Sequence, residues 1–172
     1  MPTMSSGRVI RGRTFVSACG CDAAAAPPGS SGLSAETALL GTLTIPGQPE
    51  FARLARAFVA RTLRGSFPRV DIAVLLTSEL VGNSLQYSNS RRPGGVITIT
   101  LIAVPDGIRA EVADSGGPTV PALSPPRPAE PAVVAGLSEG GRGLQLVDML
   151  SARWSYCSER TRTITWFELA ET

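Results

Sequence analysis

Two polar side chains, Glu79 and Asn83, interrupt an apolar stretch of the sequence at a spacing of four residues. In a helix, residues four apart lie on one face, and that face here also carries Leu76 and Leu80. A carboxylate and an amide are costly to bury among leucines unless they have polar partners. The pattern therefore leaves two interpretations. Both side chains reach a functional site, or they satisfy each other at a partly exposed helix edge.

A second group, Asp114-Ser115-Gly116-Gly117-Pro118, follows directly after an alternating apolar segment at residues 108–113. Aspartate, serine and glycine are common turn residues, so the segment is compatible with an ordinary turn. Taken alone, the group favours the turn, but it is also compatible with a binding site, because a carboxylate at the end of a strand can accept a hydrogen bond from an exocyclic amine. Glycines at this position would let a planar ring approach the backbone closely.

A third group, Gly141-Arg142-Gly143-Leu144, precedes an apolar helical pattern. The first amide groups of a helix lack partners within the helix, and the helix dipole adds positive potential there. Such a helix start suits an anion such as phosphate. A short glycine-rich segment is nevertheless a weak signal by itself, and the end of a flexible loop before a helix would read the same way.

Composition excludes several kinds of chemistry. The sequence has no histidine, and all 16 basic residues are arginines. Histidine-dependent hydrolysis, histidine-ligated zinc and a P-loop lysine are therefore ruled out. The net charge of +2 is too small to argue for nucleic-acid binding. No apolar run approaches the roughly 20 residues that a membrane-spanning helix needs, and no secretory signal is evident, so we expect a cytoplasmic protein without membrane contact.

The three cysteines, Cys19, Cys21 and Cys157, form no complete metal-binding motif. An odd number of cysteines without a secretion signal predicts reduced thiols. Cys19 and Cys21 have the spacing of half a metal site, but no second pair or histidine completes it, which favours an incidental pair.

The candidate residues require a particular set of elements around them. Residues 1–38 are rich in glycine, alanine, serine and proline and are predicted to be a disordered tail. Residues 39–172 are predicted to form one α+β domain with a mostly antiparallel sheet and helices on one face. Periodicity predicts helices at about 50–63, 70–87 and 144–152. Strands are expected at about 39–45, 96–102, 108–113, 153–157 and 161–169. The proline-rich segment at about 116–140 is predicted to be a long functional loop.

The order and spacing of the three groups resemble those of the GHKL ATPase superfamily, which includes DNA gyrase and the histidine kinases. Within it, the likeness is greatest to the small anti-sigma-factor serine-protein kinases of bacteria. Residues 79–84 (Glu-Leu-Val-Gly-Asn-Ser) resemble the family's N box, usually Glu-Leu-Val-x-Asn-Ala. Residues 114–118 resemble its G1 box and residues 141–144 its G2 box. The resemblance covers about residues 39–169 and implies the two-layer α/β sandwich of the GHKL (Bergerat) type.

The resemblance also implies roles for individual residues. Glu79 would act as general base, and Asn83 would help hold Mg²⁺. Asp114 would accept a hydrogen bond from the adenine amine of ATP, and Gly116 would shape the adenine pocket. The segment at 116–140 would form the ATP lid.

At the G2 box, Gly141 and Gly143 would contact the ATP phosphates through their amides, Arg142 would add charge, and Leu144 would complete the box. The chain departs from the family at Tyr87, where many relatives carry a histidine, and in a lid with few charges. Gly82 in mid-helix either makes room for a neighbour or is simply tolerated at a cost of about 1 kcal/mol.

Two functions follow from the resemblance. The first is a serine/threonine-protein kinase that phosphorylates an anti-anti-sigma (STAS-type) partner, sequesters a sigma factor and can form a homodimer. The second is a non-catalytic ATP-binding module that regulates by partner binding alone. The sparse charge of the lid keeps the second open, whereas Glu79 favours the first.

Overall fold

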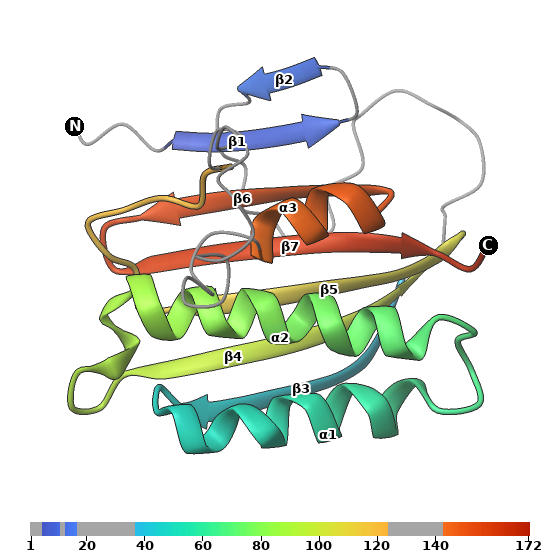
Figure 1. Cartoon of the computed structure of the whole chain (residues 1–172), viewed down its shortest axis with the longest axis horizontal. Helices are drawn as coiled ribbons and strands as arrows, with labels where there is room; N and C mark the ends of the chain where they lie inside the picture. Colours follow the sequence, from blue (N-terminus) through green and yellow to red (C-terminus); the bar gives the residue numbers. More distant parts are fainter. Residues whose placement is uncertain (1–4, 11–12, 17–36, 124–142) are drawn as a thin grey trace, which may run out of the picture.

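The computed structural model describes residues 5–10, 13–16, 37–123 and 143–172. It is an α+β structure with two layers, in which three helices cover one face of an antiparallel sheet (Figure 1). The helices are α1 (Ala52–Leu63), α2 (Val70–Tyr87) and α3 (Gly143–Leu150). The domain strands are β3 (Ala38–Pro46), β4 (Val96–Val104), β5 (Gly107–Asp114), β6 (Arg153–Glu159) and β7 (Arg162–Ala170). The predicted fold class is confirmed.

Strand order places the second motif beside the start of β7. Its order is β2-β1-β6-β7-β5-β4-β3, and every described pair is antiparallel. β5 and β7 are neighbours although they are far apart in sequence, and their register sets Asp114 opposite Thr163. The end of β5 that carries Asp114 therefore meets the start of β7.

The N-terminal region differs from its prediction. Residues expected to be disordered form β1 (Ser5–Ile10) and β2 (Arg13–Val16), which extend the sheet beyond β6. The expectation of a wholly disordered tail over residues 1–38 is therefore wrong for these two strands. The reason is tertiary: without β1, β6 would be an edge strand with unpaired backbone groups, and such an edge is a template for pairing with another strand.

The helices begin and end as their sequences direct. A 3₁₀ turn, η1 (Pro49–Phe51), leads into α1, and proline suits such a start because its amide would have no partner there. The 18 residues of α2 match the predicted helix, and a second 3₁₀ turn, η2 (Asn89–Arg91), follows it. Since α2 packs against both α1 and α3, it is the central element of the helical layer.

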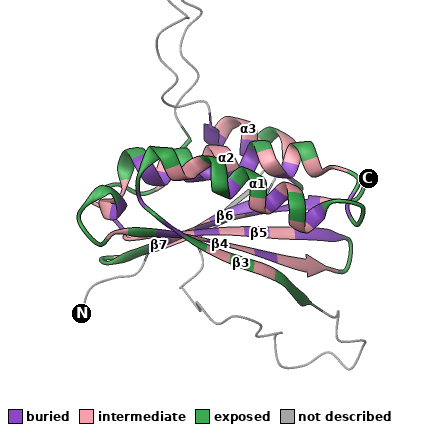
Figure 2. Ribbon diagram, turned by 90° about the horizontal axis from the view of Figure 1, so that it is seen from below, coloured by how far each residue is buried: buried purple, intermediate pink, exposed green. Residues whose placement is uncertain are grey.

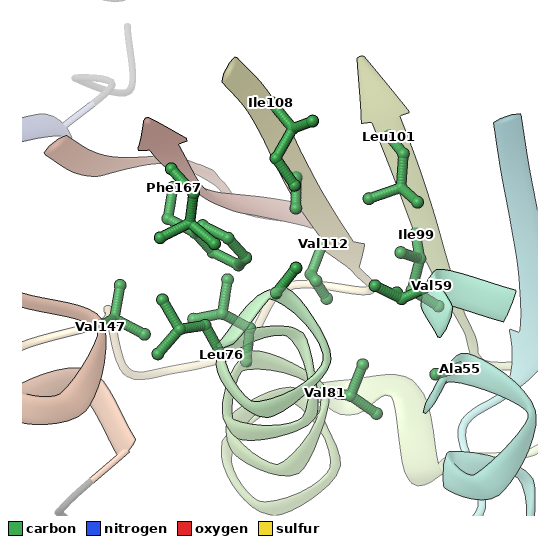
Figure 3. Close-up of a cluster of buried hydrophobic side chains, with 14 of the residues drawn as sticks. Ala55, Val59, Leu76, Val81, Ile99, Leu101, Ile108, Val112, Val147 and Phe167 are labelled. Carbon is green, nitrogen blue, oxygen red and sulfur yellow. The ribbon is translucent and has the colours of Figure 1, made fainter. Parts of the chain in front are cut away.

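The core lies between the helices and the sheet, where buried residues face each other across the two layers (Figure 2). Figure 3 shows Leu76 of α2 and Val147 of α3 with Phe167 of β7 beside them. All three side chains are fully buried. Burying a side chain of this size stabilises a fold by about 1.5–3 kcal/mol. This packing fixes α2 against the sheet and, with it, the motif that α2 carries.

Two other expectations concern the cysteines and the lid. Cys157 of β6 is disulfide-bonded, so the prediction of reduced thiols is wrong for this residue. Cys19 and Cys21 lie outside the described residues, as does most of the predicted lid, residues 124–142. Among the described helices, none is both long and apolar enough to cross a membrane.

Candidate nucleotide-binding site

The C-terminal half of α2 carries the first motif toward the end of β5. Leu80 and Val81 are buried and hold this part of the helix against the core. Glu79 and Asn83 are partly exposed on the same helix face, one turn apart. Within the part of the chain that the structure describes, neither side chain has a hydrogen bond, so the Glu79–Asn83 hydrogen bond considered from the sequence is not formed.

Asp114, the last residue of β5, is held by hydrogen bonds on both carboxylate oxygens. Ser84 Oγ donates to its Oδ2 at 2.8 Å, and the amide of Gly116 donates to its Oδ1 at 2.9 Å. Burial raises the pKa of Asp114, while the bonds from Ser84, Gly116 and the Thr163 backbone partly oppose that rise. The carboxylate therefore has a fixed orientation at the edge of the helical layer.

Gly116 is required by the turn that follows Asp114. Its φ of +62° lies in the left-handed region, which side chains other than glycine's adopt at a cost. A methyl group at Gly116 would also lie 2.8 Å from the amide nitrogen of Arg162, the first residue of β7. The carbonyl of Gly116 accepts a hydrogen bond from the amide of Asn89 at 2.6 Å. This turn thus locks the end of β5 to the end of α2.

Two serines strengthen the same junction. Ser88 Oγ donates to the carbonyl of Ser84 at 2.6 Å and accepts from the amide of Ser90 at 3.0 Å. Ser90 Oγ in turn accepts from the amide of Ser115 at 3.0 Å. Because these bonds join the end of α2 to the residue after Asp114, the two motifs are positioned relative to each other by the chain itself.

The first residue of α3 lies against the first motif. A methyl group built on Gly143 would lie 2.7 Å from Glu79 Oε2 and 3.5 Å from Asn83 Nδ2. A side chain at position 143 would therefore press on Glu79 and would also contact Asn83. The structure brings together the N-terminus of α3, where backbone amides have no partner within the helix, and the carboxylate and amide of the first motif.

A pocket of about 280 Å³ opens between these elements. Of the predicted residues, Asn83, Asp114, Gly116 and Leu144 line it, and Glu79 lies beside Gly143 at its border. Gly141 and Arg142 lie outside the described residues, so their expected phosphate contacts remain predictions. Further residues complete the wall: Leu80, Ser84, Tyr87, Ser88, Gly117, Thr119, Val120, Pro121, Ala122, Thr163 and Thr165.

Sequence reasoning missed two kinds of lining residue. Thr163 and Thr165 lie on β7, and only the pairing of β7 with β5 brings them to Asp114. The sequence did contain a usable signal, the alternation of residues along the predicted strand at 161–169. If that strand lies next to the strand ending at Asp114, every second residue on it faces the same side of the sheet as the site. Ser84 was noticed only as part of a motif, and its bond to Asp114 spans 30 positions of sequence.

The donor set is compatible with Mg²⁺ only if a ligand supplies most of the oxygens. Among the described residues, no three carboxylate, cysteine or histidine side chains cluster to form a metal site. Mg²⁺ is typically held by one or two protein oxygens together with phosphate oxygens and water. Asn83 lines the pocket and has no hydrogen bond with another described residue, so it fits that partial role.

Comparison with known families and structures identifies a family and structures of similar fold. Residues 45–169 match the histidine kinase-like ATPase domain. The fold is similar to the crystal structure of the RsbU and RsbW domains of Rv1364c from Mycobacterium tuberculosis, with a TM-score of 0.50 and 19% identity. That likeness covers 76% of this chain and 32% of the other, so the chain spans about a third of that protein's length. No curated protein sequence matches the chain significantly.

Proposed function

Because the chain belongs to the histidine kinase-like ATPase domain family, we propose that it is an ATP-binding regulatory protein with serine/threonine-protein kinase activity. Its partner is proposed to be an anti-anti-sigma (STAS-type) protein, with a sigma factor as the second partner. The motif resemblance to anti-sigma-factor kinases supports this finer assignment, and the structural likeness to a chain containing an RsbW domain agrees with it.

One observation carries the proposal: Gly143, at the start of α3, lies directly against Glu79 and Asn83 of α2. A helix N-terminus attracts phosphate, and here it lies beside a carboxylate suited to proton transfer and an amide suited to metal binding. We call this region, with Glu79, Asn83 and Gly143, the phosphate end of the pocket. The region around Asp114, with Ser84 and Gly116, is the adenine end.

At the adenine end, Asp114 offers acceptors that suit the exocyclic amine of adenine. Guanine presents a carbonyl oxygen at the corresponding position, and two acceptors facing each other leave both without a hydrogen bond. A site built around a buried polar contact discriminates strongly against a ligand that leaves it unpaired. ATP and ADP are therefore expected to bind more tightly than GTP and GDP.

At the phosphate end, Glu79 is proposed to take the proton from the attacking hydroxyl of a partner serine or threonine. The hydroxyl oxygen forms a bond to the γ-phosphorus while the bond from that phosphorus to the bridging oxygen breaks, leaving ADP. Mg²⁺, when bound, would neutralise charge on the phosphate oxygens. Asn83 would hold the ion, and the amides at the start of α3 would orient the phosphates.

A binding-only function has one observation in its favour. The segment predicted as the lid, residues 116–140, carries only two charged residues before Glu139, namely Arg127 and Glu130. Kinases stabilise transferred phosphate with positive charge, and Arg142 is the remaining basic candidate near the motif. In this alternative, ATP would bind as a structural ligand and regulation would proceed through partner binding alone.

The experiment that separates the two uses the full chain in two assays. Calorimetric titration with ATP, with and without Mg²⁺, tests binding, and transfer of radiolabelled γ-phosphate to a co-encoded anti-anti-sigma protein tests chemistry. Mg²⁺-dependent ATP binding with transfer supports the kinase. Tight ATP binding with no transfer to any such partner supports the binding-only module. Absence of ATP binding would overturn both.

A further inference from the structure

Ser84 follows Asn83 on α2, and its side chain makes a polar contact in the pocket with a residue 30 positions away in the sequence. Its Oγ donates to Asp114 Oδ2 at 2.8 Å, joining the last turn of α2 to the end of β5. Ser84 is 6% exposed, so water competes little for this bond. An alanine at this position would leave Oδ2 without that donor.

The remaining contacts of Asp114 define what Ser84 contributes. The amide of Gly116 donates to Oδ1, and the other bond that opposes the rise in the pKa of Asp114 comes from the Thr163 backbone. Both of those donors are main-chain groups, whereas the Ser84 hydroxyl is the side-chain donor that holds Oδ2. Each carboxylate oxygen can accept two hydrogen bonds. The carboxylate therefore keeps acceptor capacity for a ligand while its rotation is blocked.

We propose that Ser84 is a positioning residue that sets purine selectivity by holding Asp114 as an oriented, charged acceptor for an exocyclic amine. The inference rests on the proposed nucleotide site and deepens it. A donor from Ser84 favours the carboxylate over the carboxylic acid. Only the carboxylate presents acceptors alone, whereas the acid also presents a hydroxyl that can donate to a carbonyl such as guanine O6.

Removal of the Ser84 hydroxyl should therefore change which purine is bound and not merely weaken the site. Asp114 already lies where burial favours its protonated form. Without Ser84 that preference grows, and the carboxyl is free to turn. Affinity for the adenine amine falls, and discrimination against guanine falls with it. A nucleotide with no exocyclic amine does not use the contact and should be insensitive to the change.

The test compares Ser84→Ala with Ser78→Ala, titrated calorimetrically with ATP, GTP and purine riboside triphosphate, which lacks the amine. Ser78 is a matched control on the same helix, because its Oγ donates to the carbonyl of Val74 in the helix itself, at 2.7 Å. We expect Ser84→Ala to weaken ATP about tenfold, which is typical for a hydrogen bond to a charged group. The affinity of Ser84→Ala for purine riboside triphosphate should differ from that of the wild type by less than about twofold. Ser78→Ala should bind each nucleotide with the wild-type affinity.

A general structural role would weaken all three nucleotides alike, and that result would overturn the inference while leaving the nucleotide site intact. A wild-type protein that binds none of them would overturn both. Ser84→Cys fills nearly the same volume with a weak donor and provides a second variant should the alanine variant fold poorly. It should lose selectivity in the same direction.

An independent measurement needs no nucleotide. The carbon NMR signal of the Asp114 carboxyl, followed against pH, should give a higher pKa in Ser84→Ala than in the wild type, and an unchanged pKa in Ser78→Ala. ATP affinity should correspondingly begin to fall at a higher pH in Ser84→Ala as acid is added. Identical titration curves in wild type and Ser84→Ala would show that the hydroxyl does not hold the carboxylate, and the inference would fail.

Discussion

At the adenine end of the pocket, Asp114 accepts hydrogen bonds from Ser84 and Gly116, whereas at the phosphate end Glu79 and Asn83 have none with the residues that the structure describes. The adenine end is also tied together by backbone bonds, such as that from the Asn89 amide to the Gly116 carbonyl. The phosphate end consists of close but unbonded groups, with Gly143 leaving room beside Glu79.

This difference teaches which part of the site is ordered before a ligand arrives. A pre-formed polar contact costs little to use, because its groups are already oriented and need no further ordering. Unbonded polar groups at the phosphate end can adapt to phosphates and a metal ion. Substitutions at the adenine end should therefore change nucleotide selectivity and stability, whereas substitutions at the phosphate end should change phosphate transfer.

The largest effect is expected from Glu79→Gln, which tests whether the phosphate end carries out chemistry as well as binding. The glutamine is nearly isosteric but cannot take a proton, and loss of a general base typically lowers a rate about 10²- to 10⁴-fold. Phosphate transfer should fall by that amount while Mg²⁺–ATP affinity stays near the wild-type value. Transfer of radiolabelled phosphate and calorimetry measure the two effects. The control is Glu171→Gln, because Glu171 is exposed and follows the end of β7 that is distant from the pocket. Phosphate transfer by Glu79→Gln at the wild-type rate would refute the role of Glu79.

Gly116→Ala tests whether the adenine end is as rigid as its hydrogen bonds indicate. The variant must adopt a φ near +62° and place its methyl group 2.8 Å from a backbone nitrogen. We expect the free energy of unfolding to fall by about 2 kcal/mol or more, since left-handed backbone alone costs roughly 1–2 kcal/mol. Urea denaturation measures it, and a loss smaller than about 0.5 kcal/mol would mean that the turn adapts easily.

Asp114→Asn separates binding of the base from binding of the phosphates. The amide retains one acceptor but replaces the other with a donor, so ATP affinity should fall about 10- to 100-fold, in line with the loss of a charged hydrogen bond. GTP affinity should fall much less, because GTP does not use the acceptor. Calorimetry with both nucleotides checks the result. Equal affinity of the wild type for ATP and GTP would remove the basis of the prediction.

Gly82→Ala should stabilise the fold without touching either end of the pocket. A methyl group at Gly82 meets no atom within 4 Å, so the glycine does not make room for a neighbour within the described chain. Replacing a mid-helix glycine with alanine should raise the free energy of unfolding by about 1 kcal/mol. Chemical denaturation measures the gain, and ATP affinity should not move. A destabilised variant would show that the helix needs glycine for a reason outside these contacts.

The smallest effect concerns pH. The folded state raises the pKa of Asp114, chiefly by burial, so the folded protein holds this proton more tightly than the unfolded chain does. Stability contributed by that proton is present at low pH and declines as pH rises from about 3.9, the usual aspartate value, to the raised value. The stability of wild type relative to Asp114→Asn should decline across that window in denaturation series. A difference that increases with pH would contradict the sign of the shift.

Much of the fold was predictable because the local periodicity of apolar residues indicates helices and strands directly. The run from Val70 to Tyr87 matches α2 residue for residue, and the strands at 96–102 and 108–113 fall within β4 and β5. Apolar residues at helical or alternating spacing must face a core, so their pattern predicts both the element and its buried side. β1 was not predictable in this way, because its backbone pairing with β6 is a contact between distant segments that local periodicity does not specify.

The sequence by itself determined which residues could do chemistry: Glu79 and Asn83 one turn apart, Asp114 at a strand end, and glycines at the start of a helix. It also excluded any chemistry that needs histidine or lysine. Only the tertiary structure decided that these groups share one pocket, that Thr163 faces Asp114, and that Ser84 holds its carboxylate. The reason is physical. Spacing along one element is set by local backbone geometry, whereas contacts between residues 30 or more positions apart are set by how helices pack on the sheet and by strand register.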